Sequence, residues 1–60
     1  MFTAADKHKC ALRELKKRAR LYPRWVEAGR MHKATADHEM ALMEEIAKDY
    51  ERQEQEERLI

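Results

Sequence analysis

The sequence predicts an all-α fold, an antiparallel helical hairpin that dimerises into a helical bundle. Three observations support this prediction. Charged residues make up 42% of the 60-residue chain, and Gly and Pro occur once each, which favours long helices with solvated faces over a sheet. Apolar residues recur at helical spacing on both sides of the glycine. The halves carry opposite charge, since residues 1–30 hold nine Lys and Arg against three acids, and residues 31–60 hold four against nine.

The first helix is expected over residues 3–28. Thr3 is a suitable N-cap, and Asp6 lies in the first turn, where an acid interacts favourably with the helix dipole. Apolar or near-apolar residues then recur at alternating spacings of three and four, the heptad pattern of a helix that packs along a seam. They are Ala5, His8, Leu12, Leu15, Ala19, Tyr22 and Val26.

Pro23 lies inside this pattern and leaves two conformations open. Proline lacks an N–H, so the carbonyl of Ala19 loses its donor, and Tyr22 is pushed away from helical angles. The helix is therefore either broken at about Leu21 or kinked at Pro23, running on to about Ala28. The heptad spacing continues across the proline, which favours the kinked helix.

Gly29, the only glycine, is expected to end the first helix in the left-handed conformation. The second helix is expected over residues 33–57, with His32 at the N-cap, where a hydroxyl residue would serve better. Residues 1–60 form one domain in this interpretation, and residues 51–60 are a charged helical extension that frays unless a partner covers it. The apolar stripe of the second helix comprises Ala36, Met40, Met43, Ala47 and Tyr50, flanked by Leu42 and Ile46.

A hairpin that turns at residues 29–31 pairs positions whose numbers sum to about 60. The expected neighbours include Leu12 with Ala47, His8 with Tyr50 and Arg52, and Lys16 and Lys17 with Glu44 and Glu45. A chain with so few large apolar side chains usually needs a second copy to bury its apolar stripe. We therefore expect a homodimer with a self-association stripe of Leu12, Leu15, Met40, Met43, Ile46 and Tyr50.

The sequence contains no constellation that indicates catalysis, a metal or a cofactor. His8, Cys10, His32 and His38 lack the paired spacing of a zinc site. A single cysteine cannot form an internal disulfide, which suggests a reducing compartment. No oxyanion loop or phosphate-binding loop is present. With no signal peptide or membrane-spanning stretch, we expect a cytoplasmic protein that is not an enzyme.

The segment YPRW, residues 22–25, is the strongest candidate for a binding surface. Trp, Tyr and Arg dominate binding hot spots because they bury a large area and also satisfy polar groups. Tyr22 lies on the seam and is expected in the core. Trp25 lies one step off the seam, so core and interface positions remain equally open for it. The expected partner-binding residues are Arg20, Arg24, Trp25 and Arg30, and Lys16 and Lys17 form a secondary basic face.

Two other functions are consistent with the sequence. A nucleic-acid-binding accessory protein could use the basic segment 16–30, since phosphate affinity grows with each cation engaged. Against it, several cations are expected to face acids of the second helix, and no helix-turn-helix pattern is present. A purely structural oligomerisation element would self-associate and bind no other partner.

At YPRWVEAGRM, residues 22–31, and ADHEMALMEEIAKDY, residues 36–50, the chain resembles a group of short, uncharacterised bacteriophage and prophage proteins. Their pattern combines Tyr-Pro-Arg, a Gly-x-Met turn and an Ala-Asp-x-Glu helix, and the resemblance covers residues 3–50. It implies a phage origin, and with it stoichiometric binding of a host protein, in the host bacterial cytoplasm, that inhibits or redirects that protein for host takeover or against host defence. His32 departs from the hydroxyl residue expected at the cap, and residues 51–60 lie outside the resemblance.

Overall fold

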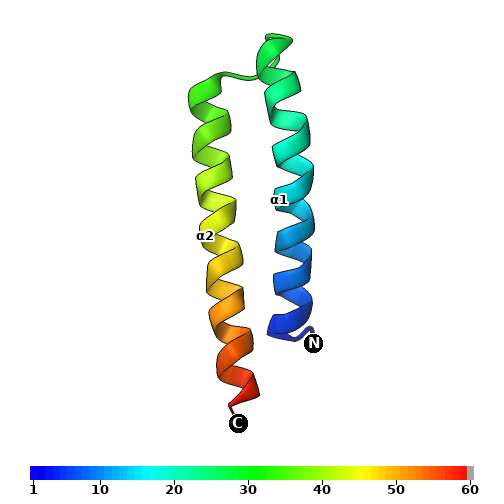
Figure 1. Ribbon diagram of the computed structural model, residues 1–60, viewed down its shortest axis with the longest axis vertical. Helices are drawn as coiled ribbons and strands as arrows, with labels where there is room; N and C mark the ends of the chain where they lie inside the picture. The colour runs from blue at the N-terminus through cyan, green and yellow to red at the C-terminus, as the bar shows by residue number, and fades with distance from the viewer. Residues whose placement is uncertain (60) are drawn as a thin grey trace.

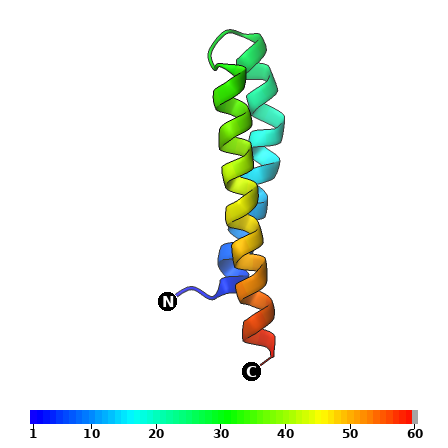
Figure 2. The same ribbon diagram turned by 90° about the vertical axis from the view of Figure 1, so that its left-hand side faces the viewer.

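The computed structural model describes residues 1–59, which form two helices joined by a short turn (Figure 1). α1 spans Ala4–Glu27 and α2 spans Lys33–Arg58. The helices run antiparallel in a rod of 48 × 16 × 15 Å, with both chain ends at the same end of the rod (Figures 1 and 2). The predicted all-α antiparallel hairpin is confirmed, and dimerisation stays a prediction. Ile60, the last residue of the predicted extension, lies outside the described residues.

α1 begins with the cap that the sequence predicts. The Oγ1 atom of Thr3 accepts a hydrogen bond from the backbone N–H of Asp6 at 3.1 Å. The Oδ2 atom of Asp6 accepts one in return from the N–H of Thr3 at 3.3 Å. This reciprocal capping box satisfies two backbone donors that the first turn of a helix leaves free.

α1 continues through Pro23 to Glu27 without a break. The alternative of a helix broken at about Leu21 is therefore wrong, and Tyr22 keeps a helical conformation. Proline removes one backbone hydrogen bond, to the carbonyl of Ala19. Because Ala19 and Pro23 are both exposed, water can solvate that carbonyl, which makes the proline tolerable here.

Gly29 ends α1 as predicted, with a φ of +74° in the left-handed region. Its N–H donates to the carbonyl of Val26 at 3.1 Å, and the N–H of Arg30 donates to the carbonyl of Trp25 at 2.8 Å. This pair of bonds is a Schellman motif, which satisfies carbonyls at a helix end. The N-terminus of α2 is less well capped. Among the described residues, the side chain of its N-cap residue, His32, forms no capping hydrogen bond.

The core lies toward the end of the rod that holds the termini, which we call the open end. Ala11, Met43 and Ala47 form its buried cluster, and Leu15, Ile46 and Tyr50 pack against them. Four of the six residues of the predicted self-association stripe therefore lie in or against the core of one hairpin. The remaining two residues are accessible to a second copy. Leu12 is 42% exposed, and Met40 lines a groove between the helices.

Candidate binding surface at the turn end

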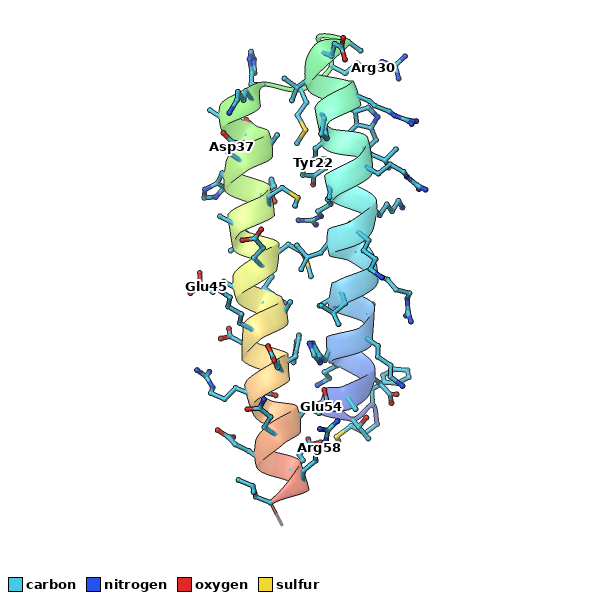
Figure 3. The ribbon with its side chains drawn as sticks, viewed as in Figure 1. Tyr22, Arg30, Asp37, Glu45, Glu54 and Arg58 are labelled. Carbon is cyan, nitrogen blue, oxygen red and sulfur yellow. The ribbon has the colours of Figure 1, made fainter. Side chains whose placement is uncertain are left out.

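At the opposite end of the rod, which we call the turn end, Tyr22 and Trp25 form an aromatic pair on α1. Their ring centroids lie 5.7 Å apart with an interplanar angle of 37°, within the range of favourable aromatic contacts. Tyr22 is half-buried and lies between the helices (Figure 3). Trp25 keeps 37% of its surface exposed. Of the two positions that the sequence leaves open for Trp25, the hairpin adopts the surface one.

Arg18 supports this aromatic pair, although it is not among the residues predicted for the site. Its Nε donates to Glu14 Oε1 at 3.0 Å, and its Nη1 donates to the backbone carbonyl of Glu39 on α2 at 3.1 Å. The guanidinium carbon lies 5.8 Å from the ring centroid of Tyr22, a cation–π distance. The Glu14–Arg18 spacing of four residues was the signal available in the sequence.

The predicted partner-binding arginines lie at the turn end like Trp25, but not on one side of it: Arg20 and Trp25 are five residues apart on α1 and therefore rotated by about 140° from each other. Arg20 and Arg24 are exposed and one helical turn apart on the side of α1 that faces away from α2. Arg30 lies at the tip of the turn and points away from the helices (Figure 3). Within residues 1–59, Arg20, Arg24 and Arg30 form no ion pair.

Further cations extend this surface along α1. Arg13, Lys16, Lys17 and Arg20 line a shallow hollow. Helical spacing adds one residue at each end, so that the stripe is about 22 Å long at 1.5 Å per residue. We define the basic face as the exposed residues Lys9, Arg13, Lys16, Lys17, Arg20 and Arg24.

Lys16 and Lys17 do not pair with Glu44 and Glu45, in contrast to the expectation from the hairpin register. No ion pair between described residues involves any of the four. Successive helical residues are rotated by about 100°, so the inward orientation of Leu15 turns both lysines away from α2. Glu45 likewise projects from the far side of α2 (Figure 3). The register placed these residues at similar positions along the rod, but the expectation that their side chains point toward each other was wrong.

The hydrogen bond that joins the helices at the open end was also not predicted. His8 Nδ1 donates to Glu54 Oε2 at 2.7 Å, with side chains only 17% and 16% exposed. Arg58 Nη2 donates to Glu54 Oε1 at 2.6 Å. The hydrogen bond from His8 lowers the pKa of Glu54, and the charge of Arg58 adds to the effect, while burial opposes it. The register placed His8 near Tyr50 and Arg52, within one turn of its actual partner.

Within residues 1–59, no three His, Cys, Asp or Glu side chains gather closely enough to hold a metal ion. Over the same residues, neither helix combines the length and apolar character needed to cross a membrane. Comparisons with protein-family models, curated proteins and solved structures gave no match to this chain. The candidate binding surface therefore rests on the geometry of its own residues.

Proposed function

We propose that this chain is a non-enzymatic protein-binding module that binds a bacterial host protein and inhibits or redirects it. Its partner-binding site is Arg20, Arg24, Trp25 and Arg30 at the turn end. The observation that carries the proposal is an exposed tryptophan at the same end of the rod as three exposed arginines that have no ion pair within residues 1–59.

This combination of side chains suits a protein partner. Covering the exposed 37% of Trp25 removes on the order of 90 Å² of surface from water, worth about 2 kcal/mol at 25 cal/mol per Å². Each guanidinium that meets a carboxylate of the partner in a desolvated contact adds about 1.5–3 kcal/mol. Trp25 with two arginines thus provides an anchor of the size found in binding hot spots.

The aromatic part of the site, Trp25, is held in place before any partner binds. Trp25 belongs to the last turn of α1, and its ring packs on that of Tyr22. Its backbone carbonyl accepts the hydrogen bond from the N–H of Arg30 that closes the turn. Arg18 holds Tyr22 against α2 through its bond to the Glu39 carbonyl. A preorganised surface loses little conformational entropy on binding, so more of the contact energy appears as affinity.

The resemblance to short bacteriophage proteins supports the mode of action. The candidate site lies on the surface of the hairpin, which suits a chain that acts by occupying a surface of its target. The partner is then a host protein with an acidic patch beside an apolar pocket. Binding is stoichiometric, and the cytoplasm of the bacterial host is the proposed place of action.

Affinity capture from a bacterial lysate tests the site. The chain is compared with the double variant Trp25→Ala, Arg24→Ala and with a matched control, Leu59→Ala, Arg52→Ala, which removes one exposed apolar residue and one arginine at the open end. We expect a captured protein whose recovery falls at least about tenfold with the first variant and is unchanged with the control.

Thermal melting by circular dichroism accompanies the capture, and Arg20→Ala, Arg24→Ala replaces the first variant if Trp25→Ala lowers stability. Equal recovery of the same partner by all variants would show that the site is wrong. Recovery of the chain alone would favour the third candidate function, a structural oligomerisation element.

Nucleic-acid binding is a second candidate function, and one observation favours it. The six cations of the basic face form no ion pair within the described residues, whereas the sequence had suggested that several would face acids of α2. A free cationic stripe along one continuous helix can contact phosphates in succession.

A salt titration of binding to a generic DNA duplex separates this candidate from the first. Nucleic-acid binding predicts a steep loss of affinity with salt and a shallower slope for Lys16→Ala, Arg20→Ala. The control, Lys48→Ala, Arg52→Ala, removes two cations from α2 and leaves the slope unchanged. Affinity that is weak and independent of salt would rule this candidate out.

A further inference from the structure

One side of the hairpin carries an apolar groove where α1 and α2 meet. Toward the turn end the groove encloses about 490 Å³, and beside Leu12 a second hollow of about 180 Å³ lies toward the open end. On α1, Leu12 lines the second hollow, and Ala19, Pro23 and Val26 line the first. These residues are spaced by seven, four and three positions, which places them on one face of the helix, so both hollows open on the same side. The principal apolar lining residues are Leu12, Ala19, Pro23, Val26, Ala36 and Met40.

The hairpin exposes more surface than a compact protein of its mass. Its accessible surface is 5081 Å², whereas the scaling for a folded monomer of 7.2 kDa gives about 4,100 Å². The excess of about 1,000 Å² is close to the roughly 800 Å² that each partner buries in a stable protein interface. A second copy covering one long side of the rod would bury an area of this size.

The charged rims of the groove are complementary to each other. From the open end to the turn end, the α1 rim presents Lys9, Lys16 and Glu27, and the α2 rim presents Glu51, Glu44 and Lys33. The two lysines flank Leu12 on α1 at helical spacings of three and four, and the other four rim residues line the hollows. At each of these three heights a cation on one rim therefore matches an acid on the other. Lys48 and Asp37, also on the α2 rim, depart from this order, and Asp37 pairs with Lys33 of its own chain at 2.9 Å.

We propose that a second copy of this chain covers the groove, with the two turn ends at the same end of the dimer and α1 of each copy lying on α2 of the other. A twofold axis parallel to the rods then brings Lys16 toward Glu44, Lys9 toward Glu51 and Glu27 toward Lys33 of the second copy. Every helix has antiparallel neighbours, as in a four-helix bundle. The alternative twofold arrangement places α1 on α1, where the cations of the two basic faces repel each other.

This dimer leaves the proposed partner-binding site accessible. The groove lining, as described within residues 1–59, does not include Trp25, Arg20 or Arg24. Each dimer thus presents two copies of the turn-end site on outward-facing surfaces. The dimer does not depend on the proposed function, since a chain that binds no host protein could still dimerise through this groove.

Sedimentation equilibrium over a range of chain concentrations tests the dimer. Leu12→Glu places a charge in the groove, and Leu42→Glu is the matched control, because Leu42 is 45% exposed and lies outside the lining described for the groove. We expect a dimer whose dissociation constant rises about 100-fold or more with Leu12→Glu, since two apolar contacts are lost per dimer. For the control Leu42→Glu, the dissociation constant should stay within about threefold of the wild-type value.

The helicity of each variant, measured by circular dichroism, shows that the hairpin itself remains folded. A chain that stays monomeric up to millimolar concentration would overturn the proposal, and so would equal effects of Leu12→Glu and Leu42→Glu.

Charge reversal tests the orientation of the two copies. Glu44→Lys sets like charges against Lys16 of the second copy, and Lys16→Glu does the same against Glu44, so each should weaken the dimer roughly three- to tenfold. The double variant Lys16→Glu, Glu44→Lys restores opposite charges in a twofold dimer and should recover the original affinity. Tighter association of Lys16→Glu alone would contradict this orientation, because it is the result expected when α1 packs on α1.

Discussion

The two ends of the hairpin are held together by different interactions. Toward the open end, buried Ala11, Met43 and Ala47 form a close-packed cluster between the helices. Between residues 18 and 40 of the described chain, Ala36 is the one buried residue, and the helices are joined there by the bond from Arg18 to the Glu39 carbonyl. The open end therefore supplies the apolar packing that stabilises the fold. The turn end keeps its large side chains partly exposed, where a partner can reach them.

Met43→Ala, compared with Met40→Ala, tests this contrast with the largest expected effect. Removing the buried Met43 side chain leaves a cavity in the cluster and should cost about 2–5 kcal/mol of unfolding free energy. A loss of this size would unfold much of a 60-residue hairpin. Met40 lines the groove and is half-buried, so its truncation should cost less than about 1 kcal/mol. Urea unfolding at low chain concentration measures both, and equal losses would refute the contrast.

The turn itself is tested by Gly29→Ala. A Cβ atom at Gly29 would meet no described atom within 4 Å, so the effect comes from the positive φ alone. We expect a loss of about 1–2 kcal/mol. Gly29→Asn should lose less, since asparagine tolerates the left-handed region better. Thermal melting of the two variants checks this order, and Gly29→Ala with wild-type stability would contradict it.

Arg18→Ala removes the polar link between the helices at the turn end. Losing the bonds to Glu39 and Glu14 should cost about 1 kcal/mol. It should also shift the emission of Trp25, the single tryptophan, because Tyr22 loses a neighbour. Arg20→Ala is the control, with a change within about 0.5 kcal/mol because it forms no ion pair within residues 1–59. If both variants behave alike, Arg18 has no special role.

Glu54→Gln should give the smallest effect, visible in the pH dependence of stability at the open end. The pKa of Glu54 is lowered in the folded chain, chiefly by the hydrogen bond from His8. Its contribution to stability is therefore present above the pKa of an unfolded Glu and is lost as the pH falls through the lower folded pKa. Melting between pH 7 and pH 2 should show a shallower acid-induced loss in Glu54→Gln than in wild type.

Glu56→Gln is the control for this measurement, since Glu56 is exposed and forms no side-chain ion pair among residues 1–59. Its acid-induced loss should match that of wild type. An identical pH profile for all three chains would mean that the contact between His8 and Glu54 adds nothing to stability.

Much of the fold was predictable because its signals act over a few residues. Thr3 and Asp6 form the expected capping box, and Gly29 adopts the expected left-handed conformation. The continuation of α1 through Pro23 was favoured by the heptad spacing, but local rules alone left a broken helix open. The structure answers that question with a continuous helix, in which Ala19 and Pro23 are both exposed.

The candidate site was only partly predictable. The exposure of Arg20, Arg24 and Trp25 agrees with their expected role as surface residues, while the role of Arg18 and the pair of His8 with Glu54 were missed. The pairing rule used for the hairpin gives the height of each residue along the rod. It does not give the rotation of each helix about its axis, which determines whether a side chain points inward or outward. This is why Lys16 and Lys17 were placed opposite acids that they do not reach.

The sequence by itself determined where each helix begins and that the chain folds back at its glycine, because capping, backbone conformation and apolar spacing are local properties. Only the tertiary structure decided which cations are bound within the hairpin and which are free, and which apolar side chains are covered. These outcomes follow from the relative rotation of two packed helices, which is set jointly by side chains far apart in the sequence.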